Sequence, residues 1–303
     1  LKSIDAQGNK YFERNPYYWK VDTAGNQLPY IDRQTRVLVR DAEVRILRLF
    51  SGELHVAAEN PLPVANLPLY KENEASGNYR TMLFENTRGA DAAFAFNLTH
   101  KDPVLREIFN DIRFRQAMSL AINRQEINEI FYFGQAAERQ ATAPPMTSFY
   151  EDWMGEYFAE FDPDRANALL DEMGLVWDRS RQVRLRPDGR PLQIVLETTE
   201  EFAPVAELVA EHWSAVGVAT TMRQLERLFF YERGPANDRD AAAWTYDGVS
   251  EFSMRADSCH RFRPTWGTPI DPAPLWQAWF DTGGQSGEEP PEEVKTIYAL
   301  CDQ

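Results

Sequence analysis

The spacing of apolar residues predicts a chain in which helices and strands alternate. Residues 111–127, DIRFRQAMSLAINRQEI, place Phe114, Met118 and Ile122 four residues apart, which is the spacing of one buried helical face. Residues 204–216 predict a further helix, which ends at Gly217. This alternation through residues 80–250 is typical of a layered α/β architecture.

Capping residues predict where several helices begin and end. Asn123, followed three residues later by Glu126, resembles a capping box and predicts a helix that runs toward Phe133. In DPDRANALLDEMG, Asp162 is the predicted N-cap, and Gly174 is the predicted stop. Asp41 is the predicted cap of a shorter helix near the start of the chain.

Strands are predicted where short apolar runs lie between turn residues. The predicted hairpin VRLRPDGRPLQIVLE turns at Asp188 and Gly189. The other predicted strands cover residues 34–40, 52–57, 79–84, 92–98, 218–225 and 241–246.

The segment NPYYWKVDTAGNQLPYIDR concentrates aromatic residues around one polar loop. Gly25 and Asn26 tolerate the positive φ of a tight turn. We therefore expect a hairpin whose aromatic side chains, Tyr17, Trp19 and Tyr30 among them, pack into a core.

Composition and charge narrow the class of protein. The chain has 303 residues, of which 43% are hydrophobic, enough for one large domain or two. Its formal net charge of -15, without a Lys/Arg cluster, argues against a nucleic-acid partner and against an anionic membrane surface. The polar start has no signal region and no initiator Met, as expected of a processed or truncated chain.

The sequence shows no motif of a known catalytic or metal site. G-x-S-x-G and H-E-x-x-H are missing, and the histidines are scattered. The adjacency of Cys259 and His260 is weak support for a metal site. DTGGQSGEE lacks the Lys-Ser/Thr of a phosphate loop, and the acidic run EEPPEEV fits a helix start. We predict neither an enzyme nor a cofactor.

A binding function has better support, because tryptophans gather late in the chain. Four of the eight lie between Trp244 and Trp279, in loop-like sequence that also contains Asp247 and Arg255. Flat rings beside polar groups are the usual lining of a small-molecule cleft. For Trp276 and Trp279, three residues apart, one packed helical stripe is the favoured interpretation.

Taken in order, several motifs resemble family 5 of the extracytoplasmic solute-binding proteins of ABC importers, the peptide/nickel/oligosaccharide class. They are ERNPYYWKVDTAGNQLPYIDR, LFSGELHVA, FNLTHKDPVLREIFNDIRFRQAMSLAINRQEI, DPDRANALLDEMG and WFDTGGQSGEEPPEEV. The resemblance implies a two-lobed, type II periplasmic-binding-protein-like α/β fold, here incomplete, with mixed sheets flanked by helices. Residues 1–88 would be a remnant of the first lobe, and residues 89–303 most of the second, with one hinge strand near 82–95.

The resemblance also implies a function. Such a protein captures an oligopeptide or oligosaccharide in a cleft between lobes and delivers it to a membrane permease. It would be extracytoplasmic, either periplasmic or a membrane-anchored lipoprotein. Ligand contacts are expected from the cleft edge, first from Trp244, Tyr246 and Asp247; the second choices are Asn97, Arg255 and Trp266.

The identity of the ligand stays open at this point. Peptide-binding relatives hold the ligand's amino terminus with an acidic loop residue, for which Asp247, Glu251 and Asp257 are all candidates. The tryptophans slightly favour an oligosaccharide over an oligopeptide. Nickel is the least favoured of the three candidate ligands, because histidines are few. The alternatives are a carbohydrate-active hydrolase and a sugar or peptide receptor without a role in transport.

Overall fold

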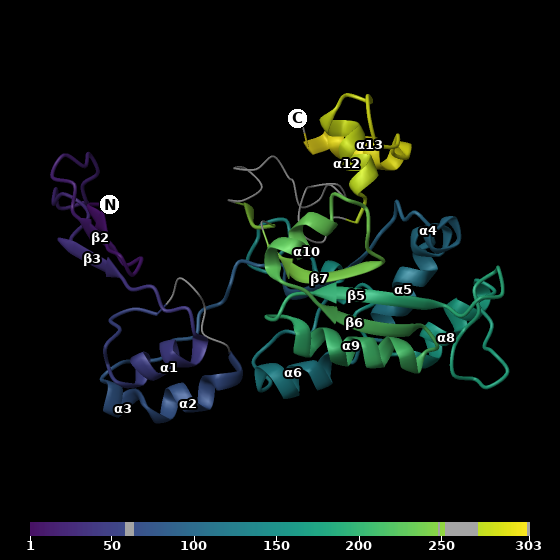
Figure 1. Cartoon of the computed structure of the whole chain (residues 1–303), viewed down its shortest axis with the longest axis horizontal. Helices are drawn as coiled ribbons and strands as arrows, with labels where there is room; N and C mark the ends of the chain where they lie inside the picture. Colours follow the sequence, from purple (N-terminus) through teal and green to yellow (C-terminus); the bar gives the residue numbers. More distant parts are fainter. Residues whose placement is uncertain (58–63, 248, 252–271, 302–303) are drawn as a thin grey trace. The chain divides into compact units, whose positions relative to one another are not determined.

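The chain folds into two compact units, Leu1–Leu83 and Phe84–Gln303 (Figure 1). The computed structural model describes residues 1–57, 64–247, 249–251 and 272–301. In these ranges the predicted mixed α/β architecture, with sheet strands flanked by helices, is confirmed.

The first unit contains a small antiparallel sheet and short helices. Asp41 caps α1 as predicted, because its carboxylate accepts a hydrogen bond from the Val44 amide at 2.9 Å. The two helices after α1 have only one or two turns, and Pro68 lies in the first turn of one of them, where proline is tolerated. The elements are β1 (Ser3–Ile4), β2 (Lys10–Glu13), β3 (Arg33–Arg36), α1 (Ala42–Phe50), η1 (Val64–Asn66), α2 (Leu67–Glu72) and α3 (Glu74–Gly77).

Two strand predictions in this unit are wrong. Residues 52–57 and 79–84 form no strand, because their backbone groups bond to nearby helices instead of to a neighbouring strand. The Glu53 amide donates to the Arg48 carbonyl of α1, and the Thr81 amide donates to the side chain of Glu74. A strand needs a partner, and here local contacts take its place.

The aromatic loop of residues 15–33 also departs from its prediction. The turn forms, with Gly25 at φ +84° and a bridge between Val21 and Gln27, but the aromatics do not reach a core. Tyr17, for example, is 90% exposed, and Trp19 is 78% exposed. The cause is the adjoining sheet, whose residues are almost all exposed on both faces, so that it offers no apolar layer.

The second unit is built on a four-stranded mixed sheet in the order β4-β7-β5-β6. The strands β5, β6 and β7 are parallel, and β4 joins the edge of β7 antiparallel. The predicted turn at Gly189 is present, with φ +82°, although only one side of the predicted hairpin becomes a strand. The bounds are β4 Ala90–Phe96, β5 Gln193–Thr198, β6 Ala219–Gln224 and β7 Ala241–Tyr246.

Helices flank this sheet, and two of them begin at the caps that the sequence predicts. The Asn123 side chain accepts from the Glu126 amide at 3.1 Å, and the Asp162 side chain accepts from the Arg165 amide at 2.9 Å. Figure 1 shows α9 running along β6, with α10 near β7. The helices are α4 (Pro103–Asn110), α5 (Ile112–Leu120), α6 (Arg124–Tyr132), α7 (Asp152–Glu156), α8 (Pro163–Glu172), α9 (Ala203–Ala215), α10 (Arg227–Arg233), α12 (Pro274–Asp281) and α13 (Glu292–Cys301).

Alternate residues of β7 enter two different cores. Ala241 and Ala243 belong to the main core, which contains Trp213 of α9 and side chains from α4, α5 and α8. Ala242 and Trp244 belong to a smaller core on the other face. The period of two follows from the pleat of the strand, and it places Trp244 against α10.

Candidate functional site

The candidate site lies where β7 ends and β4 begins. Because the two strands are antiparallel, Tyr246 pairs with Ala90, and the Gly89 amide donates to the Tyr246 carbonyl at 2.6 Å. The predicted residues Trp244, Tyr246 and Asp247 therefore share one end of the sheet. We call this end, where β7 stops and β4 starts, the β4–β7 edge. Loops and binding residues commonly gather at such an edge, where a rigid sheet holds them in place.

Trp244 is enclosed by aromatic and cationic side chains. Its ring stacks on Phe230 at 5.5 Å with an interplanar angle of 24°, and it meets Phe202 at 5.1 Å. The guanidinium of Arg227 lies over the ring, 5.1 Å from its centroid. Only 6% of the residue is exposed, so Trp244 is a buried anchor of this edge and presents no open ring face.

The helix α10, which supplies these contacts, was not predicted. Its apolar residues Leu228, Phe229, Phe230 and Tyr231 are consecutive, so they carry no helical period. Its cap gave no signal either, because Glu226, which accepts from the Leu228 amide at 2.8 Å, is not one of the residue types preferred at helix N-caps. Of these side chains Phe230 is buried, whereas Leu228 is 71% exposed.

Charged and hydroxyl groups surround the first residues of β4. Asp91 lies 3.7 Å from Arg88 and accepts a hydrogen bond from Asn86. Burial raises the pKa of Tyr132 to about 12, with a further contribution from the charge of Asp91. Burial also lowers the pKa of Arg139, whose guanidinium donates to the Ala143 carbonyl and forms no ion pair with any residue in the described ranges.

The acidic loop after β7 is described only in part. The Thr245 hydroxyl lies 3.4 Å from a carboxylate oxygen of Asp247. The amide and hydroxyl of Ser148 both donate to Glu251, which ties this loop to the segment after α6. Arg255, Asp257 and Trp266 lie outside the described residues.

Asn97 lies at the opposite end of the sheet from Tyr246 and Asp247. It follows β4, and its amide donates to the carbonyl of Asp240, which precedes β7. Its side chain donates to Asn237 and to the Arg239 carbonyl, and accepts from the Thr99 amide at 3.0 Å. The residue is 3% exposed, and this network accounts for its burial.

Gly89 packs closely against Tyr246, and this contact can be tested by substitution. A Cβ at this residue would come within 2.7 Å of the Tyr246 ring and still closer to the Thr142 carbonyl. We expect Gly89→Ala to lower the free energy of unfolding by about 1–3 kcal/mol, measured by urea denaturation. The control is Gly234→Ala, where φ is -59° and the nearest atom lies at 3.7 Å. Equal costs for the two variants would contradict the assigned packing.

No helix in the described residues is long and apolar enough to cross a membrane. The same part of the chain contains no group of three or more His, Cys, Asp or Glu residues that could hold a metal ion.

Comparison with known proteins identifies the family of this chain. Residues 1–257 match the model described as "Bacterial extracellular solute-binding proteins, family 5 Middle". The chain belongs to family 5 of the bacterial extracellular solute-binding proteins. The family resemblance inferred from the sequence motifs is thereby confirmed.

Family 5 relatives with different ligand names are similar to the chain. Di/tripeptide-binding protein 2 of Pseudomonas aeruginosa is 26% identical over 241 residues, covering 78% of this chain and 39% of the relative. The periplasmic alpha-galactoside-binding protein of Rhizobium meliloti is 25% identical, covering 92% of this chain and 41% of the relative. The chain therefore spans about two fifths of the length of these relatives.

A solved structure in the same group supports the fold. The oligopeptide-binding protein OppA is 36% identical, with a TM-score of 0.69, over 98% of this chain and 49% of that structure. Solved neighbours of this kind are two-lobed periplasmic binding proteins.

Proposed function

We propose that the chain is part of a solute-binding protein that delivers a small solute to an ABC permease. The family supports this proposal, and so does the β4–β7 edge, where Trp244 anchors α10 beside Tyr246 and Asp247. Residues 1–88 would contribute to the first lobe and residues 89–303 to most of the second. The protein would act outside the cytoplasm, in keeping with the family's description as extracellular. Family 5 consists of binding proteins, which favours this function over that of a hydrolase.

Among solutes, we place an oligopeptide ahead of an oligosaccharide. A sugar stacked on Trp244 would need an open face of its indole ring, and both Phe230 and Arg227 cover that ring. A peptide instead needs a carboxylate for its amino terminus and hydrogen bonds for its backbone. Asp247 directly follows β7 and is only partly buried, which suits it to the first role. The names of OppA and the Pseudomonas relative agree with this order, whereas the name of the alpha-galactoside-binding relative keeps the sugar as second candidate.

The deciding measurement is ligand-induced stabilisation with matched probes. We expect trialanine to raise the melting temperature, because a ligand at a hundredfold excess over Kd adds about 2.7 kcal/mol of stability. N-acetyl-trialanine, which lacks the ammonium group, should give a much smaller shift. Stabilisation by raffinose or cellotriose alone would reverse the order of the two solute classes, and no shift with any probe would contradict both.

The role of Asp247 is tested separately by substitution. We expect Asp247→Asn to weaken trialanine binding by about tenfold or more, because the ammonium loses its charged partner. Binding of N-acetyl-trialanine should change little. The control is Asp281→Asn, an exposed carboxylate at the end of α12, which should leave both affinities unchanged. Equal losses for both peptides would show that Asp247 does not hold the amino terminus.

A further inference from the structure

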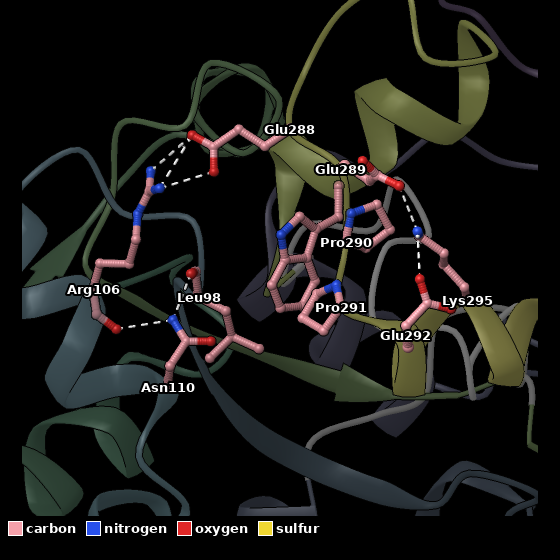
Figure 2. A pocket seen from close by; sticks show the side chains of 10 residues that line it. Leu98, Arg106, Asn110, Glu288, Glu289, Pro290, Pro291, Glu292 and Lys295 are labelled. Carbon is pink, nitrogen blue, oxygen red and sulfur yellow. Dashed lines mark hydrogen bonds and ion pairs between the residues drawn. The ribbon is translucent and has the colours of Figure 1, made fainter.

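A pocket of about 550 Å³ (Figure 2) lies in the second unit, at the end of the sheet away from Tyr246. Leu98, in its wall, follows the last residue of β4, whereas Tyr246 pairs with the first residue of that strand. The volume falls within the range of small-molecule sites. Its lining comes from the end of β4, from α4, α12 and α13, and from the loop before α13: Leu98, Arg106, Asn110, Trp276, Glu288, Glu289, Pro290, Pro291, Glu292 and Lys295.

The basic side chains of this pocket already have partners. Arg106 forms a bidentate ion pair with Glu288, with the shortest contact at 2.8 Å, and donates to the carbonyls of Thr99 and His100. Lys295 lies 2.5 Å from Glu289 and 2.8 Å from Glu292 (Figure 2). An anionic ligand would therefore find three carboxylates and no cation without a partner, which disfavours an anion.

Two hydrogen-bonding groups in the pocket lack partners among the described residues. Trp276 is 8% exposed, and its indole N–H donates to none of them. Asn110 uses its amide nitrogen to donate to the carbonyls of Leu98 and Arg106, as Figure 2 shows, and its amide oxygen accepts no hydrogen bond from that part of the chain. Neither atom is enclosed by protein, so both reach solvent through the mouth of the pocket, where a ligand can replace the water that bonds to them.

The remaining walls are flat and apolar. Pro290 is buried, and Pro291 and Leu98 add further hydrocarbon surface beside the Trp276 ring. A suitable ligand therefore has an apolar face and polar groups that both donate and accept. A hydroxyl can accept from the indole N–H and donate to the Asn110 oxygen or to a glutamate, whereas an ammonium group can only donate.

We propose that this pocket binds a neutral hydroxylated ring, a sugar unit of one or two rings. Trp276 and Asn110 provide the polar contacts, and Pro290, Pro291 and Leu98 provide the apolar wall. The site is separate from the β4–β7 edge, so it is independent of which solute that edge binds.

The test is a titration of the chain with cellobiose, observed through the indole N–H signals of its eight tryptophans. Trp276→Phe identifies the Trp276 signal by its loss. We expect this signal to shift with cellobiose in the millimolar range and to stay in place with glucose 6-phosphate. No shift of the Trp276 signal with cellobiose, or the same shift with both compounds, would overturn the proposal. A shift of the Trp244 signal alone would place the sugar at the β4–β7 edge instead, and would overturn it too.

Variants test the two polar contacts one at a time. Saturation-transfer NMR on cellobiose should show binding roughly three- to tenfold weaker for Trp276→Phe, which keeps a ring and loses the N–H. Asn110→Ala, at an exposed position, should weaken binding by a similar factor. The matched control is Trp153→Phe, whose indole donates to Glu151 and is not part of the pocket. Unchanged binding in Asn110→Ala, or an equal loss in the control, would overturn the assignment.

Discussion

Replacing Glu197 by alanine should destabilise the second unit by about 3–5 kcal/mol. The Glu197 side chain is 1% exposed in β5, and both of its oxygens accept from Arg233 Nε at 2.9 Å. Arg239, whose side chain is 4% exposed, lies 3.7 Å away. Without the carboxylate, two largely buried guanidinium groups would lose their shared counter-charge, which is costly in a buried place. Arg233 would keep its ion pair with Asp238, whose side chain is 54% exposed.

Urea denaturation, followed by circular dichroism, measures the cost. The control is Arg223→Ala, which removes another cation from the same carboxylate at 3.5 Å, but from a side chain that is 51% exposed. Solvent screens that pair, so we expect a loss below about 1 kcal/mol. Similar losses for Glu197→Ala and Arg223→Ala would show that burial does not set the energy of this cluster.

Trp213→Ala should cost a comparable amount, about 3–5 kcal/mol, for a different reason. Trp213 of α9 is 1% exposed and packs on Phe96 of β4, with ring centroids 5.1 Å apart. Its indole N–H donates to the Met118 carbonyl of α5 at 2.9 Å. Removing the ring would leave a cavity where the sheet and two helices meet.

The same denaturation measurement separates packing from the hydrogen bond. Trp213→Phe keeps an aromatic ring, so its loss should be clearly smaller than that of alanine, although the Met118 carbonyl loses its donor. Trp153→Ala, at a site 57% exposed, should change stability by only about 0.5 kcal/mol. A large loss at Trp153, or a negligible one at Trp213, would contradict the assigned core.

The sequence predicts those elements whose signals are local. The caps at Asn123 and Asp162 bond to amides within their own first turn, so the helices after them could be located from a few neighbouring letters. Residues 79–84 have a strand-like pattern but no strand beside them, and pairing depends on distant parts of the chain. In α10, four consecutive apolar residues do not indicate which side chain is buried, and in the structure it is Phe230.

The candidate site shows the same division between local and distant information. The run AAAWTYDG was enough to predict that Trp244, Tyr246 and Asp247 end a strand together. The position of Asn97 at the far end follows from the antiparallel pairing of β4 with β7, which its own neighbours do not reveal. The burial of Trp244 likewise depends on α10, an element the pattern did not predict.

The alanines of β7 constrain how this unit can change in evolution. Ala241, Ala242 and Ala243 are 0–1% exposed in a strand with neighbours on both sides, and they touch cores on opposite faces. A larger side chain at any of them would have to be matched by a smaller one in the facing layer. Substitutions at these three positions are therefore expected to occur together with compensating substitutions in the elements packed on the two faces of the sheet. The exposed Leu228 on α10 can change without such compensation.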